Sequence, residues 1–185
     1  MSGYEYIWVK VNEPETDLPL LREQYHVSVL SEGARFACAA EVDEGGESPA
    51  DTLQALSNSF GEAIFMSVQT TVDFFLYSHW RDGELLREIT YCADEGWYEL
   101  QGEKQAWEQR LFSENERLRQ LSYLDLDHLA KNPNTAEYDD AQRLAAQIST
   151  VWTAKELIED SFYPMATASE LYYLVMRELS LTNPY

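Results

Sequence analysis

The side chains in this sequence that could support metal or acid–base chemistry gather most densely at Asp125, Asp127 and His128. Carboxylates and imidazole are ligands for zinc and other divalent metals. Two carboxylates at i and i+2 share a face only on a strand, whereas this stretch looks like a short helix or a turn. Asp139 and Asp140 could join them only from beyond a proline-containing break. We therefore interpret the segment as a polar helix end, and we expect no metal site.

A thiol nucleophile with a histidine base is the second chemistry to consider. Cys38 or Cys92 could meet His26 or His79 only through folding, since such pairs are adjacent in space rather than in sequence. Each cysteine lies within an apolar, strand-like segment, where a free thiol behaves as a small hydrophobic side chain. Both cysteines are therefore predicted to be structural.

Motifs that would indicate an enzyme are missing from the sequence. It contains no glycine-rich phosphate loop, no GxSxG turn, no HExxH pair and no CxxC pair, and its three histidines are scattered. We expect no catalytic residue, no metal and no cofactor.

Binding residues are easier to nominate than catalytic ones. His79, Trp80 and Arg81 precede a predicted hairpin turn, and tryptophan and arginine are enriched in binding hot spots, while histidine suits pH sensing. Alternatively, Trp80 packs beneath the turn and Arg81 pairs with a neighbouring acidic residue.

A second group of candidates, Trp97, Tyr98 and Trp107, could line a groove for an aromatic or extended ligand. Packing in the core is the alternative, because aromatic side chains usually dominate cores. The stretch that holds them, EGWYELQGEKQAWE, resembles small bacterial proteins without assigned functions, and this resemblance gives no residue a role.

Charge narrows the choice of partners. The net charge is −20, and residues 1–102 hold 19 acidic and 5 basic residues. Such a surface disfavours naked nucleic acid and anionic membranes, whereas a basic protein partner fits it. The excess acid serves either solubility or recognition by a negatively charged sheet face.

Location is predicted from cysteine usage and from the N-terminus. Two cysteines are too few for a disulfide framework, and no charged stretch followed by an apolar one marks a secretory signal. The longest apolar run, Ala63–Trp80, contains Asp73 and several other polar residues, so it is predicted to form sheet rather than a membrane span. A reducing, cytoplasmic location is expected.

A β-meander over residues 70–102 must position most of these candidates. Asp82-Gly83 suits the two-residue turn of a hairpin, because such a turn requires positive φ. Alternation along its first strand predicts one almost wholly apolar face and one mixed face. The apolar face holds Val72, Phe74, Leu76, Ser78 and Trp80, and the mixed face holds Asp73, Phe75, Tyr77 and His79.

Further strands are predicted before the meander, together with one helix. The expected order is a strand at Tyr4–Val11, a loop at Asn12–Leu20, a hairpin of Tyr25–Leu30 with Ala34–Val42, and an acidic linker at Asp43–Glu47. Ser48 and Pro49 then suit the first positions of a helix that Gly61 ends. Its buried side is predicted to hold Leu53, Leu56 and Phe60.

Helices are predicted beyond residue 102. Glu103–Arg119 has an imperfect helical pattern, and a second helix follows the break at Lys131–Thr135 with a clear apolar stripe that ends at Trp152. Capping-box patterns predict two more helix starts, Thr153 to Glu156 and Thr167 to Glu170.

These elements predict one α+β domain over residues 1–185, with a sheet portion at 1–102 and a helical portion at 103–185. Runs of strands followed by helices are typical of a mostly antiparallel sheet, here of about five or six strands with one inserted helix. We expect the C-terminal helices to pack on the sheet, where the apolar face of the meander needs a cover.

Two functional hypotheses follow. One is a small acidic cytoplasmic protein without catalytic activity, of inhibitor, immunity or adaptor type, that binds a basic protein partner. The other is a small-molecule binder or an unrecognised enzyme with an aromatic-lined pocket between sheet and helices. Homo-oligomerisation is compatible with both.

Overall fold

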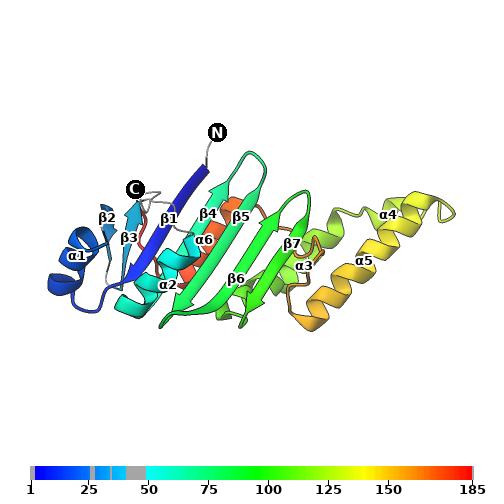
Figure 1. The fold of residues 1–185 in the computed structure, drawn as a ribbon. Helices are drawn as coiled ribbons and strands as arrows, with labels where there is room; N and C mark the ends of the chain where they lie inside the picture. The colour runs from blue at the N-terminus through cyan, green and yellow to red at the C-terminus, as the bar shows by residue number, and fades with distance from the viewer. Residues whose placement is uncertain (1–2, 26–27, 34, 41–48, 185) are drawn as a thin grey trace.

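The computed structural model describes residues 3–25, 28–33, 35–40 and 49–184 (Figure 1). Its strands are β1 (Gly3–Lys10), β2 (Ser28–Glu32), β3 (Phe36–Ala40), β4 (Glu62–Gln69), β5 (Phe74–Arg81), β6 (Glu84–Cys92) and β7 (Gly96–Gly102). Within the described residues they form one antiparallel sheet of seven strands, in the order β2-β3-β1-β4-β5-β6-β7. The strand that begins the chain therefore lies inside the sheet, paired with β3 and β4.

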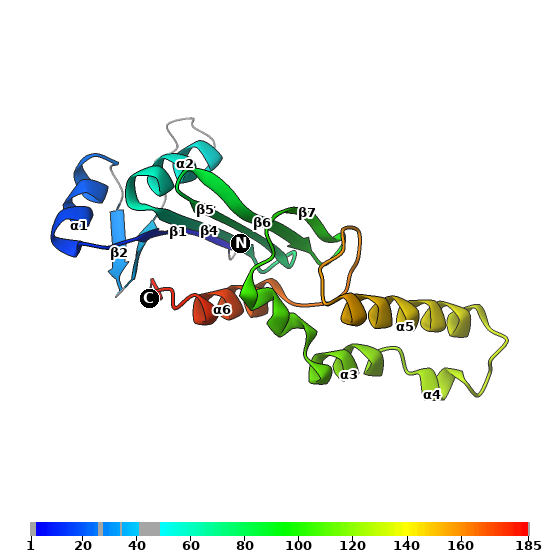
Figure 2. The ribbon, with the colours of Figure 1, turned by 90° about the horizontal axis from the view of Figure 1, so that it is seen from below.

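Helices cover both faces of this sheet. They are α1 (Pro14–Glu23), α2 (Pro49–Phe60), the 3-10 helix η1 (Ala106–Phe112), α3 (Glu114–Ser122), α4 (Leu126–Leu129), α5 (Ala136–Ala154) and α6 (Ala168–Glu178). Figure 2 shows α1 and α2 on one face and α6 on the other, while α3, α4 and α5 extend past β7. The fold is α+β, with C-terminal helices packed on the sheet. No helix in the described part of the chain is long and apolar enough to cross a membrane.

The predicted hairpin turn is confirmed. Asp82 and Gly83 have φ of 49° and 80°, as a two-residue turn with two positive φ angles requires. Helix α2 holds this turn, because Ser57 Oγ accepts from Gly83 N at 3.0 Å and Gln54 Nε2 donates to Gly83 O at 3.0 Å. The turn thus fixes α2 across the ends of β5 and β6.

Two other helix predictions are also confirmed. Leu53, Leu56 and Phe60 are buried on α2, while Ser48 and the predicted linker before it lie outside the described residues. Thr167 begins α6 with the expected capping box, in which its side chain accepts from the backbone N–H of Glu170.

The prediction of five or six strands was too low, because the apolar run Ala63–Trp80 contains two strands. β4 and β5 pair with each other across a tight turn, at which Asp73 has φ of 49°. Periodicity did not show this break, since apolar and aromatic residues continue on both sides of it.

The segment Asn12–Leu20, predicted as a loop, contains most of α1. Pro14 stands in the first turn, where no backbone donor is needed, and Asp17 Oδ2 accepts from the backbone N–H groups of Asn12 and Glu13 at 2.8 and 2.9 Å. Pro19 lies inside the helix at an exposed position. Burial of Leu18 and Leu21 against the sheet stabilises the helix.

The helix start at Thr153 was wrong as well. Thr153 lies in the last turn of α5, and its hydroxyl donates to the carbonyl of Ser149 at 2.8 Å. Lys155 then ends the helix with φ of 52°. Glu103–Arg119 is not one helix either, since Ser113 separates η1 from α3 and caps the latter.

Coverage of the meander by the C-terminal helices is confirmed, but the face that they cover is the mixed one. Phe75, Tyr77 and His79 are buried on this side, whereas Phe74 and Leu76 on the opposite side are only partly buried. The helices can cover polar side chains because these side chains form hydrogen bonds with one another, as His79 does with Tyr77 and Glu62.

Candidate functional site

Polar groups converge on Glu62 at the start of β4, a group that we name the Glu62 cluster: Lys10, Arg35, Glu62, Tyr77, His79 and Arg81. The Glu62 side chain is 4% exposed. Its Oε1 lies 2.9 Å from His79 Nε2 and 3.1 Å from Arg81 Nη2. The register of β4 against β5 places Arg81 directly opposite Glu62. His79 precedes Arg81 by two residues and lies on the same face of β5.

The second carboxylate oxygen of Glu62 faces two more cations. Oε2 accepts from Arg35 Nη2 at 3.1 Å, and Lys10 Nζ lies 3.9 Å away. The side chains of Lys10, Arg35 and Arg81 are 33%, 55% and 50% exposed. Solvent therefore reaches the cationic side chains of the cluster but not the carboxylate of Glu62.

Glu62 is ionised in this setting. Burial raises the pKa of its carboxyl, but hydrogen bonds and charge from His79 and Arg81 outweigh burial and lower this pKa from 4.5 to about 2. An ionised carboxylate only accepts, so Nε2 of His79 carries a proton and donates it to Glu62. Nδ1 of His79 lies 3.0 Å from the Tyr77 hydroxyl.

Carboxylate, imidazole and hydroxyl in a row form the arrangement of a general acid–base relay. Here the hydroxyl is at the buried end, because Tyr77 is fully buried and its ring packs edge-on against Trp107 at 5.4 Å. Burial raises the pKa of Tyr77 far above its usual range. The geometry therefore supports a structural hydrogen-bond chain rather than an activated nucleophile.

A second buried ion pair lies beside this chain. Arg87 on β6, directly opposite His79, donates from Nε and Nη2 to the two carboxylate oxygens of Glu108 at 3.1 and 2.8 Å. Glu108 belongs to η1, where its Oε1 also accepts from the backbone N–H of Gln105 at 2.6 Å. This pair attaches η1 to the sheet.

Of the residues nominated from sequence, the structure brings His79 and Arg81 together on Glu62, with Trp107 close by through Tyr77. Arg81 thus pairs with an acidic residue, as the alternative interpretation expected. Trp80 points to the opposite face, where it is partly buried and donates to Ser78 Oγ at 3.0 Å.

Trp97 and Tyr98 lie further along the sheet. Trp97 is fully buried, its ring lies tilted against that of Tyr91 with 4.7 Å between the ring centroids, and its indole N–H donates to the carbonyl of Pro164 at 2.9 Å. Tyr98 is partly buried on the opposite face. Trp97 and Trp107 therefore occupy the space between sheet and helices with their own side chains.

Sequence reasoning missed Glu62, Arg35 and Lys10, and also the Arg87–Glu108 pair. Strand parity offered one signal, since alternation alone places Tyr77, His79 and Arg81 on one face of β5. Glu62 directly follows a helix-ending glycine and has the appearance of an exposed loop residue. Only the register of β4 against β5 brings it to Arg81.

The weaker candidates stay apart. In the described part of the chain no three His, Cys, Asp or Glu side chains are placed to hold a metal ion, and Asp125 only precedes the short helix α4. Cys38 is buried, and burial raises the pKa of its thiol to about 12, so it remains protonated at neutral pH. His26 lies outside the described residues.

The face of the sheet opposite the C-terminal helices is partly uncovered, and we name this uncovered part the open face. It holds Glu5, Ser67, Phe74, Leu76, Ser78, Glu88, Thr90, Tyr98 and Glu99. The register forms one row from Glu5 through Ser67, Leu76 and Thr90 to Tyr98. In both views α2 lies to one side of it, and no helix of the described residues covers β6 and β7 there (Figures 1 and 2).

Hydroxyls at the base of the open face orient two of its carboxylates. Ser67 Oγ donates to Glu5 Oε1 at 2.8 Å, and Thr90 Oγ1 donates to Glu99 Oε2 at 2.9 Å. Glu99 reaches this face because a bulge in β7 gives it a positive φ of 52°. Glu5 and Glu99 are exposed, and Glu88, which lies in the next row opposite Ser78, is half-buried.

Charge is segregated between the two faces. The basic residues of the described strands, Lys10, Arg81 and Arg87, all lie on the helix-covered face, where Glu62 and Glu108 pair with them. On the open face, Glu5, Glu88 and Glu99 make no ion pair with lysine or arginine of the described residues. The open face is therefore acidic, with partly exposed Phe74, Leu76 and Tyr98 among its carboxylates.

Comparison with models of protein families gives a match. A model for a family of unknown function, DUF6928, matches residues 31–128. No curated protein matches the chain, and no solved structure does. The matched segment holds Arg35, Glu62, His79 and the Arg87–Glu108 pair, but it excludes β1, the strand between β3 and β4. Since the match spans more than half of the sequence, the chain belongs to this family of unknown function, DUF6928.

Proposed function

We propose that this protein is a non-catalytic interaction protein, of inhibitor, immunity or adaptor type, whose open face binds a basic protein partner. The observation that carries this proposal is the charge segregation across the sheet. Each strand-borne cation is neutralised on the helix-covered face, while Glu5, Glu88 and Glu99 on the open face lack a cationic partner among the described residues.

The physical basis is electrostatic complementarity. Carboxylates presented on one surface steer a basic partner into encounter and fix its orientation, and this contribution weakens as salt is added. Glu5 and Glu99 are already oriented by hydroxyls of Ser67 and Thr90, so less side-chain freedom is lost when a partner binds. Phe74, Leu76 and Tyr98 supply apolar contact between the charges.

A reducing, cytoplasmic setting is part of the proposal. It is supported by the two cysteines, Cys38 and Cys92, which are both free thiols. In this setting the partner would be another intracellular protein with exposed lysine and arginine.

The test is capture from the native lysate with three tagged proteins, washed at low and then high salt. The first is the wild type, and the second carries Glu5→Gln, Glu88→Gln and Glu99→Gln. The third is a matched control that removes three exposed carboxylates elsewhere, Glu15→Gln, Glu23→Gln and Glu156→Gln. Circular dichroism and thermal unfolding check that all three are folded.

We expect one basic protein to be retained by the wild type and the control at low salt, released at high salt, and lost from the open-face variant. Equal retention by the open-face variant would remove this surface from the interaction. If the wild type retains no basic protein, the acidic face serves solubility and the proposed function is wrong.

A further inference from the structure

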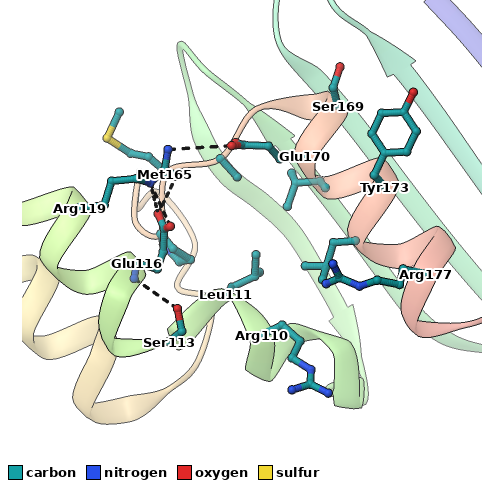
Figure 3. A pocket seen from close by; sticks show the side chains of 14 residues that line it. Arg110, Leu111, Ser113, Glu116, Arg119, Met165, Ser169, Glu170, Tyr173 and Arg177 are labelled. Carbon is teal, nitrogen blue, oxygen red and sulfur yellow. Dashed lines mark hydrogen bonds and ion pairs between the residues drawn. The ribbon is translucent and has the colours of Figure 1, made fainter.

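A hollow of about 590 Å³ lies on the far side of the sheet from the open face, between η1, α3 and α6 (Figure 3). Leu111 and Leu171 line it with buried apolar side chains. Met165 and Tyr173, which also line it, are 41% and 63% exposed. The hollow therefore offers apolar area to a partner without any rearrangement of the core.

Three arginines, Arg110, Arg119 and Arg177, line this hollow. Residues 103–185 contain eight basic residues, so three of these eight line the hollow, together with the carboxylates of Glu116 and Glu170. Arg110 Nε lies 3.3 Å from one oxygen of Glu178, and Arg177 Nε lies 3.4 Å from the other. Two guanidinium groups thus share one carboxylate, and their terminal nitrogens bond to none of the described residues.

The carboxylates that line the hollow are committed to other partners. Glu116 accepts from Arg119 Nε and Nη2 at 3.0 and 2.7 Å. Glu170 Oε2 accepts from the backbone N–H of Thr167 at 2.8 Å in the capping box of α6. A ligand carboxylate would therefore bind the terminal nitrogens of Arg110 and Arg177, and the nearest opposing charge is the one carboxylate of Glu178 that both guanidinium groups share.

The frame of the hollow is rigidly held. Gln120, which is buried on α3, accepts from Met165 N at 3.0 Å and donates to Met165 O at 2.9 Å. These two bonds fix the segment between α5 and α6 and present the Met165 side chain toward solvent. Preorganised surfaces of this kind lose less entropy on binding.

We propose that this hollow binds an acidic amphipathic peptide segment of a protein partner. An apolar side chain of the peptide lies over Leu111 beside Met165 and Tyr173, and flanking carboxylates bind the terminal nitrogens of Arg110 and Arg177. Tyrosine, methionine and arginine are among the residue types enriched at protein interfaces. This site uses none of the open-face residues, so the proposal for the hollow can be tested independently of the proposed function.

The experiment measures fluorescence anisotropy of a labelled hexapeptide, Glu-Glu-Leu-Phe-Glu-Glu, titrated with the full-length protein. Two companion peptides replace either the four glutamates by glutamine or the leucine and phenylalanine by serine. The variant Arg110→Gln/Arg177→Gln removes the two guanidinium groups that share Glu178. The control Arg22→Gln/Arg143→Gln removes two exposed arginines that each pair with one carboxylate elsewhere.

Saturable binding of the acidic amphipathic peptide is expected, weakened about tenfold or more by Arg110→Gln/Arg177→Gln and at most about twofold by the control. Both companion peptides should bind more weakly. Since the protein carries a net charge of −20, general electrostatics opposes an acidic peptide, and saturable binding requires a specific site. No saturation up to about 1 mM, or equal loss in both variants, would overturn the proposal.

Discussion

His79 Nε2 lies 2.9 Å from Glu62 Oε1, which joins the imidazole of β5 to the first carboxylate of β4 beneath the C-terminal helices. This contact explains how the mixed face of the meander can be buried. It also anchors the cations of Arg81, Arg35 and Lys10 on the same side of the sheet. Because these cations pair with Glu62 on the helix-covered face, they do not compensate the carboxylates of the open face. The Glu62 cluster and the acidic charge of the open face therefore both result from the way charge is divided between the two faces of the sheet.

Glu62→Gln should lower the free energy of unfolding by about 3–5 kcal/mol at pH 7, because it removes the charge that four neighbouring groups share in a buried setting. The decrease is measured by urea denaturation followed by tryptophan fluorescence. Glu84→Gln, at an exposed position on the hairpin, is the control and should change stability by less than about 0.5 kcal/mol.

The same carboxylate predicts an acid dependence. Its folded-state pKa of about 2 lies below the 4.5 of an unperturbed glutamate, so the unfolded state takes up the proton first. The stabilisation is complete above pH 4.5 and is lost as pH falls toward 2, a loss of about 3 kcal/mol. Wild type and Glu62→Gln should therefore converge in stability at low pH. A difference that stays constant from pH 7 to pH 3 would contradict this account.

Arg87→Met should cost about 3–5 kcal/mol, because it leaves Glu108 buried without its cation. The double variant Arg87→Met/Glu108→Leu should regain much of this loss, since an apolar pair needs no charge compensation. Recovery remains incomplete because Gln105 N loses its acceptor. Denaturation of the two single variants and the double variant forms a double-mutant cycle, and additive losses would show that the pair is not coupled.

Much of the fold could be predicted from local sequence patterns. The Asp82-Gly83 turn, the apolar stripe of α2 and the capping box at Thr167 each depend on residues close together in the chain. The insertion of β1 between β3 and β4 depends on pairing between distant segments, which periodicity does not encode. Pro14 favours a loop when its residue type is considered alone, whereas in α1 it fills the first turn of a helix, which proline also suits.

Less of the candidate site could be predicted, for a similar reason. Residue types identified His79 and Arg81, but their shared partner Glu62 comes from another strand and is found only through the register. The open face could not be predicted, because apolar alternation indicates that the face with Phe74 and Leu76 is the buried one. Hydrogen bonds among Tyr77, His79 and Glu62 allow the mixed face to be buried instead.

The tryptophans of the meander should differ in their effect on stability. Trp97→Ala should cost about 3–5 kcal/mol, because Trp97 is fully buried and its indole donates to the carbonyl of Pro164. Trp80→Ala should cost about half as much, since Trp80 is only partly buried against α2. Urea midpoints of both variants test the order. A larger loss for Trp80→Ala would mean that the α2 side of the sheet, and not the C-terminal side, carries the main core.

Gln120→Leu should destabilise the protein by about 2–4 kcal/mol, because the backbone N–H and C=O of Met165 both lose their buried partner. The matched control is Gln147→Leu at an exposed position of α5, which should have little effect. Hydrogen exchange adds a local readout, since the amide of Met165 should exchange faster in Gln120→Leu, while amides in the centre of β5 change only with global stability. Unchanged exchange at Met165 would show that Gln120 does not hold the segment between α5 and α6. Faster exchange there would identify Gln120 as the positioning residue for the arginine-lined hollow, because Met165 forms part of its rim.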